Sequence, residues 1–136
     1  MTSETTLTTG TAGTAGNTRL VRDYLEIVWN QGDTAAADRY VAEDLIQHNP
    51  NLPDGRQALV EFIDATRGQL PALHFELRRT AAEGDLVFAH SLFRPAPGQA
   101  GLAVIDVFRV AGGVIAEHWD LNEPVPETTA SGHPVV

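Results

Sequence analysis

The sequence predicts an α+β domain, in which three N-terminal helices pack on a strongly curved, mainly antiparallel sheet. Apolar residues recur at helical spacing in the first half of the chain. After Pro71 the pattern changes to an alternation of apolar and polar residues, which is typical of strands. The predicted order is therefore helix, helix, strand, helix and then four strands, with helices and strands segregated along the chain.

The first helix is expected to run from Asn17 or Thr18 to about Asn30, because apolar side chains there fall on one face. A short second helix covers Thr34–Val41, and a third covers about Arg56–Gln69. Each is bounded by residues that favour caps or turns. These helices would cover one face of the sheet.

The predicted strands are short and separated by turn residues. A first strand, Leu45–His48, ends at Asn49-Pro50. His74–Ala81 and Leu86–Arg94 form the next two strands, and a hairpin completes the sheet over Ala103–Asn122, which reads AVIDVFRVAGGVIAEHWDLN. A curved sheet wrapped on one side by helices would leave a conical cavity, and ligands favour such cavities.

Composition limits the possible partners. At 136 residues the chain is long enough for one domain with a hydrophobic core. Its 9 basic and 18 acidic residues give a net charge of −9, which argues against nucleic acids and anionic membranes as partners. The chain has no cysteine, so thiol nucleophiles, thiolate metal sites and disulfides are excluded. No apolar run approaches the length of a membrane span.

Three segments follow from the composition along the chain. Residues 1–16 consist mostly of Thr, Gly and Ala, and we expect a flexible tail there. This stretch lacks the basic start and continuous apolar segment of a secretory signal, so we expect a cytoplasmic protein. Residues 17–122 form the domain, and residues 123–136, with three prolines, are expected to be irregular and to pack over the domain or a partner subunit.

The final hairpin carries three ionisable residues within apolar runs: Asp106, His118 and Asp120. With a two-residue loop at Gly112-Gly113, Asp106 would face Trp119 and the other two would lie on the opposite face. With a three-residue loop and a bulge, Asp106 would oppose His118 and all three would share one face. Because one step of register flips a strand's side chains, the loop decides the matter. We favour the three-residue loop; the alternative is that these residues solvate an outer face.

Three stretches resemble the SnoaL-like polyketide cyclases of the nuclear-transport-factor-2-like (NTF2-like) superfamily: LIQHNP at 45–50, FAHSLFR at 88–94 and IDVFRVAGGVIAEHWD at 105–120. The resemblance spans about residues 17–122. It implies an NTF2-like cone, a homodimer through the outer face of the sheet, and a cofactor-free aldol-type or other acid–base reaction. It also implies that Asp120 is the essential acid/base and that Asp106 takes the second polar position, where the characterised cyclases carry a histidine.

The residues themselves support acid–base chemistry. Proton removal next to a carbonyl needs a base in a desolvated site and a donor for the developing enolate oxygen. Two carboxylates close together in an apolar cavity raise each other's proton affinity, so Asp120, Asp106 and His118 are the candidate catalytic residues. The candidate residues that bind a small hydrophobic or polyketide-like ligand are His48, His90, Trp29, Tyr24 and Asn49.

Other chemistries are less well supported. His118 and Asp120 are two potential metal ligands, but the chain has no HExxH motif and no cysteine ligand, so we expect no metal and no cofactor. Ser91 lies beside His90 without a nucleophile elbow, which argues against a catalytic triad. Two alternatives stay open: a hydrolase or isomerase that uses the same cavity, and a non-catalytic binding protein.

Overall fold

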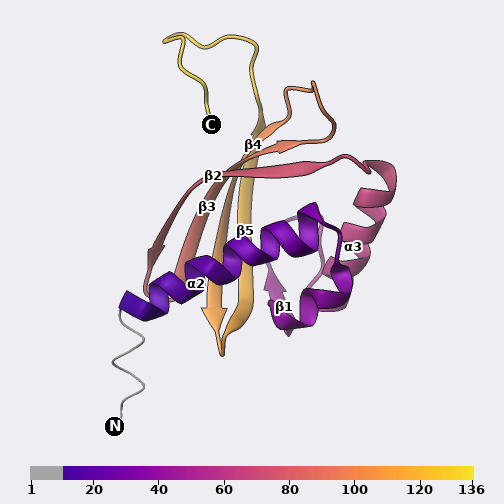
Figure 1. Ribbon diagram of the computed structural model, residues 1–136, viewed down its shortest axis with the longest axis vertical. Coiled ribbons are helices and arrows are strands. Elements are labelled where there is room, and N and C mark those ends of the chain that lie inside the picture. The colour runs from indigo at the N-terminus through magenta and orange to yellow at the C-terminus, as the bar shows by residue number, and fades with distance from the viewer. Residues whose placement is uncertain (1–10) are drawn as a thin grey trace.

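The computed structural model describes residues 11–136, which form a curved five-stranded sheet with the helices on one of its faces (Figure 1). One continuous helix opens this part of the chain and changes from α-helical to π-helical geometry at Tyr24. The elements in chain order are α2 (Thr11–Asp23), the π-helix η1 (Tyr24–Asn30), the 3₁₀-helix η2 (Thr34–Arg39), β1 (Val41–Gln47), α3 (Arg56–Gln69), β2 (His74–Glu83), β3 (Leu86–Arg94), β4 (Leu102–Ala111) and β5 (Val114–Pro124).

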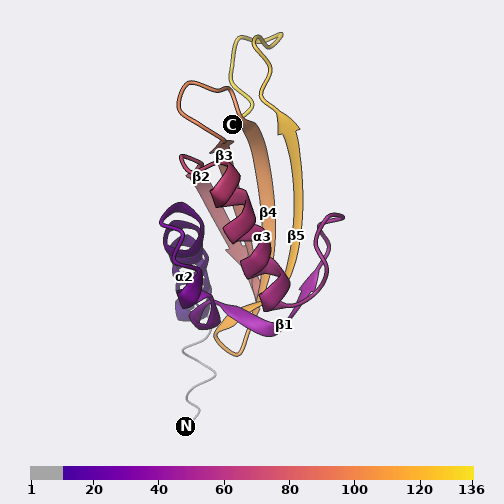
Figure 2. The same ribbon diagram turned by 90° about the vertical axis from the view of Figure 1, so that its right-hand side faces the viewer.

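The strands lie in the order β1-β5-β4-β3-β2. Strands β2 to β5 form an antiparallel meander, and β1 adds in parallel to β5 at the opposite edge from β2. In the view of Figure 2 the helices lie on one side of the sheet, and β4 and β5 curve along the other. The predicted α+β class and the predicted order of elements are therefore confirmed.

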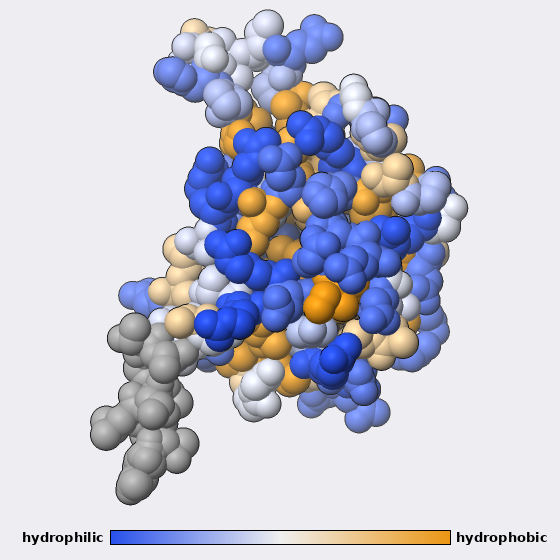
Figure 3. All heavy atoms as spheres, viewed as in Figure 1, coloured by the Kyte–Doolittle hydropathy of each residue, from blue (hydrophilic) through white to orange (hydrophobic). Residues whose placement is uncertain are grey.

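The hydrophobic core lies between the helices and the inner face of the sheet. Val21 and Val28, on the helix formed by α2 and η1, are fully buried against it. Their partners from the sheet include Val87, Ala89 and Phe108, which alternate with outward-facing residues along β3 and β4. The surface of the helical side is mostly hydrophilic (Figure 3).

The outer face of the sheet is less covered. The C-terminal segment of the chain turns back over this face, so that Val136 packs against Leu92 and Ala103. Arg78 donates a hydrogen bond to an oxygen of Val136 at 3.1 Å. The segment predicted to be irregular began at Glu123, whereas β5 continues to Pro124 and residues 125–136 contain no helix or strand. Large apolar side chains beyond the C-terminal segment are exposed on the outer face: Ile46, Phe88, Ile105 and Leu121.

Some predicted boundaries are wrong. The first helix begins at Thr11 and not at Asn17 or Thr18, so residues 11–16 are helical and do not belong to a tail. Residues 1–10 of the predicted tail lie outside the described residues. Val41 belongs to strand β1 and not to the short helix, which ends at Arg39. Within residues 11–136, no helix combines the length and apolar character that a membrane crossing requires.

Candidate active site

The hairpin of β4 and β5 has a register that neither predicted alternative described. Its loop is the two-residue one, with Ala111 opposite Val114, and both loop glycines have positive φ angles of 60° and 81°, as a tight hairpin turn requires. A bulge then follows, because Arg109 pairs with Glu117 while Val110 pairs with Ile115. The extra residue shifts the register by one.

As a result the three ionisable residues share the inner face, as predicted, but with different partners. Asp106 lies directly opposite Asp120, and His118 lies opposite Phe108. The predicted pairing of Asp106 with His118 across the ladder is therefore wrong, although their side chains do meet diagonally. Arg109 and Glu117 face outward and form an ion pair at 2.8 Å.

His118 is hydrogen-bonded through both ring nitrogens. Its Nε2 lies 2.8 Å from Asp106 Oδ1, and its Nδ1 lies 2.8 Å from Gln47 Oε1. Because the Gln47 oxygen can only accept, Nδ1 carries a hydrogen. The contact between Nε2 and Asp106 then needs one further proton, on either the imidazole or the carboxyl group. Asp106 and His118 thus share a proton that can be donated.

The two carboxyl groups have different surroundings. Asp106 is only 5% exposed, and burial raises the pKa of its carboxyl group. The hydrogen bond and charge of His118 lower this pKa, and the neighbouring Asp120 raises it. Asp120 is partly exposed, and the side-chain amide of Asn49 donates to both of its oxygens, at 3.1 and 3.0 Å. The Asn49 amide holds the Asp120 carboxyl group in position at the cavity, whereas Asp106 is engaged by His118, so Asp120 is the better candidate for a base.

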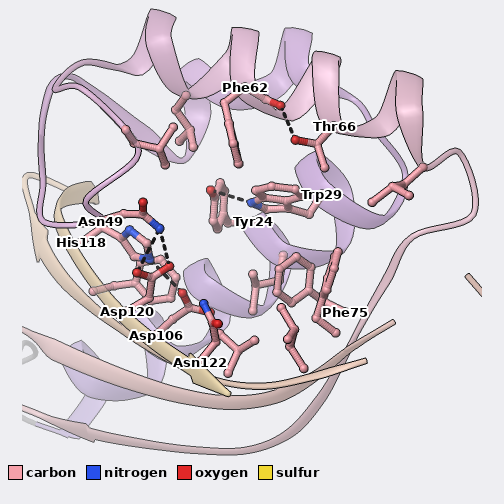
Figure 4. Close-up of a pocket in the computed structure, with 18 residues that line it drawn as sticks. Tyr24, Trp29, Asn49, Phe62, Thr66, Phe75, Asp106, His118, Asp120 and Asn122 are labelled. Atoms are coloured by element: carbon pink, nitrogen blue, oxygen red, sulfur yellow. Dashed lines mark hydrogen bonds and ion pairs between the residues drawn. The ribbon is translucent and has the colours of Figure 1, made fainter. Parts of the chain in front are cut away.

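These groups lie at one end of a cavity of about 250 Å³ between the helices and the sheet. Asn49 and Asn122 lie at this polar end with Asp106, His118 and Asp120 (Figure 4). Apart from the hydroxyl groups of Tyr24 and Thr66, the rest of the wall consists of aromatic and aliphatic side chains: Leu25, Trp29, Leu52, Leu59, Phe62, Leu70, Phe75, Phe93, Leu102, Val104 and Phe108. No lysine or arginine lines the cavity among the described residues.

Tyr24, Trp29 and Asn49, three of the five predicted ligand-binding residues, line this cavity. Tyr24 and Trp29 come from η1, and Trp29 Nε1 donates to the Tyr24 hydroxyl at 3.0 Å. Asn49 lies in the turn after β1, where its amide reaches across to β5.

His48 does not line the cavity, contrary to our expectation. It stacks on Trp119 with ring centroids 4.7 Å apart and contacts Glu117 at 2.7 Å, on the outer face. The reason is the alternation in β1, where the buried Leu45 and the half-buried Gln47 point inward, so Ile46 and His48 point outward.

His90 is also on the outer face, where it contacts Arg79. The inward positions of β3 are instead Ala89 and Ser91, both fully buried. Ala89 belongs to the core cluster that also contains Val21 and Val28 of the N-terminal helix. Alternation along β3 places the larger Phe88 outward with His90, and the size of Phe88 misled the prediction of which face is inside.

Sequence reasoning missed Gln47, which fixes the tautomer of His118. A signal for it was present: in a strand that buries Leu45, alternation places Gln47 rather than His48 on the inner face. The aromatic wall formed by Phe62, Phe75 and Phe93 was also not identified. These residues come from three separate elements, and only the fold brings them together.

The cluster of Asp106, His118 and Asp120 also has the residue types of a metal site. One ligand atom from each of Asp106, His118 and Asp120 lies within 4.8 Å of the others. Two ligands of a tetrahedral Zn²⁺, each at about 2.0–2.1 Å from the ion, would lie roughly 3.3 Å apart. The 2.8 Å separation of His118 Nε2 and Asp106 Oδ1 is shorter and is that of a hydrogen bond. The expectation that the site works without a metal stays a prediction.

Comparison with known proteins gives one family and one fold. The SnoaL-like domain matches residues 21–118 of the chain. TsrD from Streptomyces laurentii is 24% identical over 80% of this chain and 89% of its own, with a TM-score of 0.67. No match was found among curated proteins.

Two other solved structures are similar to the chain to about the same degree in sequence identity, coverage and TM-score. A proposed polyketide cyclase from Acidithiobacillus ferrooxidans is 20% identical, with a TM-score of 0.67, and the match covers 79% of this chain and 88% of that one. A SnoaL-like protein of unknown function from Burkholderia thailandensis is 18% identical, with a TM-score of 0.69, covering 80% of this chain and 95% of that one. At these identities the similarities establish the fold alone.

Proposed function

The chain belongs to the SnoaL-like family, and from that membership we propose that it is a cofactor-independent enzyme that performs acid–base chemistry on a carbonyl compound. The reaction proposed is an intramolecular aldol condensation of the polyketide cyclase type. The observation that carries the proposal is the convergence of Asp106, His118 and Asp120 at the polar end of a mostly apolar cavity. Such a site combines a base with a proton donor in surroundings that exclude most water.

Asp120 acts as the general base. It removes a proton from the carbon next to the substrate carbonyl, and the electron pair of the broken C–H bond forms the enolate. The enolate carbon then attacks a second carbonyl group of the same molecule, and the new alkoxide takes the proton that Asp106 and His118 share. The proton held by Asp120 restores that pair, so the cycle consumes no cofactor.

The lining of the cavity favours a neutral substrate. Its ionisable groups other than Tyr24 are two carboxyl groups and one histidine, with no cationic side chain to balance a substrate carboxylate or phosphate. The aromatic end offers the faces and edges of Trp29, Phe62 and Phe75. The Trp29 ring makes edge-to-face contacts with both phenylalanines, at centroid distances of 6.1 Å to Phe62 and 5.2 Å to Phe75. An aromatic or conjugated ketone fits both ends.

The test is proton exchange. The wild-type protein should catalyse exchange of the α-hydrogens of 1-tetralone or benzoylacetone for deuterium in D₂O, measured by proton NMR. The Asp120→Asn variant should lose about 10²–10⁴-fold of this rate, as expected for removal of a general base. Asp38→Asn, at an exposed position, is the matched control and should keep full activity.

Circular dichroism should show that the Asp120→Asn variant keeps its fold. Full exchange activity in this variant would end the proposal. Tight binding of the ketones without any exchange in the wild type would favour the non-catalytic binding protein. Conversion of an epoxide, but not of a ketone, would favour the hydrolase.

We extend the proposal to a homodimer that forms through the outer face of the sheet. Leu121 is 78% exposed there, and Ile46, Phe88 and Ile105 are 41%, 41% and 37% exposed. Apolar side chains gathered on one face are a common mark of an interface. The stacked pair of His48 and Trp119 would lie at the edge of the same surface.

A further inference from the structure

The hydroxyl group of Tyr24 has an unused proton. Trp29 Nε1 donates to the Tyr24 oxygen at 3.0 Å, in a buried contact. A phenol hydroxyl can accept a hydrogen bond and also donate one. None of the described residues accepts the Tyr24 proton in a hydrogen bond, although the side chain is only 4% exposed. The indole N–H approaches from one side, so the hydroxyl proton is directed away from Trp29.

The π-helical turn η1 brings this pair together. In an α-helix, two residues five positions apart point about 140° away from each other around the axis. A π-helix follows an i→i+5 hydrogen-bond pattern, which brings such residues close to the same face. Tyr24 and Trp29 are separated by five positions, and both are buried within η1. Short π-helical segments occur often at functional sites.

Both rings are held by neighbouring elements. Trp29 lies between Phe62 and Phe75, and Arg67 of α3 donates to its carbonyl oxygen at 2.9 Å. The Tyr24 ring packs edge-to-face on Phe108, with centroids 5.9 Å apart. The hydroxyl group is therefore fixed in position before any ligand binds, and little ordering remains to be done on binding.

Tyr24 lies between the polar and aromatic ends of the cavity (Figure 4). Burial raises the pKa of its hydroxyl well above the ordinary value, the hydrogen bond from Trp29 lowers it, and the charges of Asp106 and Asp120 raise it further. The group thus stays protonated at neutral pH and acts as a donor, not as a base. The indole N–H polarises the hydroxyl and so strengthens it as a donor.

We propose that Tyr24 donates a hydrogen bond to the carbonyl oxygen of the bound substrate and stabilises the enolate oxygen that develops there. Trp29 is the positioning residue, because it acts only through Tyr24. When Asp120 removes the α-proton, the C=O π electrons move to the oxygen, and Tyr24 keeps its own proton throughout. This inference rests on the proposed function for its catalytic part, while binding of a carbonyl group through Tyr24 is independent of turnover.

The probe is 1-tetralone labelled with ¹³C at its carbonyl carbon, followed by NMR. Binding to the wild type should move the carbonyl signal downfield, as hydrogen bonding to a carbonyl oxygen does, and Tyr24→Phe should remove that shift. The same variant should lower the α-hydrogen exchange rate by about 10²–10³-fold, which is the usual cost of losing one oxyanion donor. Tyr40→Phe, which changes the other tyrosine of the chain outside the cavity, should alter neither reading.

Trp29→Phe is the second variant, since it removes the indole N–H and keeps an aromatic ring. It should reduce the carbonyl shift and the exchange rate by less than Tyr24→Phe does. A carbonyl signal that the wild type leaves unmoved, or that moves equally with Tyr24→Phe, would overturn the inference. A shift that depends on Tyr24 in a protein that exchanges no hydrogen would instead refute the proposed function and leave the donor role intact, and Asp120→Asn should keep the shift.

Discussion

Asn30 links the end of η1 to the edge of the sheet, and its replacement tests how strongly the cavity wall is held. Its side-chain amide donates to Phe75 O at 2.9 Å and accepts from Phe75 N at 2.8 Å. The pair of bonds occupies the free edge of β2, the last strand of the sheet. Asn30→Ala removes these two bonds, at about 0.5–1.5 kcal/mol each, together with an exposed hydrogen bond from Asn30 to Glu26 at 3.1 Å. Because the exposed bond contributes little, we expect a loss of about 1–3 kcal/mol.

For a chain of this length, 1 kcal/mol corresponds to about 4 °C in Tm, so the loss should lower the Tm by roughly 4–12 °C. Thermal and urea denaturation, followed by circular dichroism, measure it. Gln31→Ala is the control, because the exposed side chain of Gln31 donates a hydrogen bond to the exposed Glu26, and it should change stability by less than about 0.5 kcal/mol. An Asn30→Ala protein as stable as the wild type would show that the edge bonds contribute nothing.

Four further predictions concern the buried polar groups, the surface and the site. Burial raises the pKa of Asp106, so this group contributes full stability below the ordinary carboxyl pKa of about 3.9 and loses it as pH rises toward the folded pKa. In the wild type, the free energy of unfolding contributed by Asp106 should fall by at most about 1.4 kcal/mol per pH unit, and Asp106→Asn should abolish this fall. Urea denaturation between pH 4 and 8 measures it. Ser91 Oγ is buried without a hydrogen-bond partner among the described residues, and Ser91→Ala should raise stability by about 1 kcal/mol; a loss in thermal denaturation would contradict this. Leu121→Asp should convert the proposed dimer to a monomer in sedimentation velocity without changing the fold, and a dimer that persists in this variant would contradict the proposed interface. Exchange of 1-tetralone should be unaffected by EDTA, and a loss restored by Zn²⁺ would replace the acid–base proposal with a metal site.

The order of elements could be predicted because periodicity and turn residues agree along most of the chain. The start of the first helix could not, because Thr and Gly in residues 11–16 have poor helix propensity. The structure nevertheless places the helix start at Thr11. The π-helical turn is likewise invisible in the apolar pattern, since Tyr24, Leu25 and Val28 also fit an α-helical face.

The shared face of three site residues could be predicted in the hairpin, although the register that produces it could not. Asp106, His118 and Asp120 were predicted to share one face of the hairpin, because gathering the ionisable side chains on one face leaves the other face apolar. His48 and His90 failed for a shared reason: in both strands the inward neighbours are smaller or more polar than the outward ones. In β1, Gln47 points in and Ile46 points out. Hydrophobicity alone therefore gives the wrong face wherever the outer surface of the sheet is itself apolar.

The hairpin register shows what two correct rules imply when they are combined. Turn chemistry favours a two-residue loop at Gly112-Gly113, and in a regular ladder this puts Asp106 opposite Trp119. The requirement for one polar face puts Asp106 and Asp120 on the same side. Because the two rules differ by one position, both hold only if one extra residue lies between the loop and Asp120. This extra residue lies in the bulge of β5, between Ile115 and Glu117. Treating the rules as alternatives tied the bulge to a three-residue loop, whereas accepting both rules places it in β5 beside a two-residue loop.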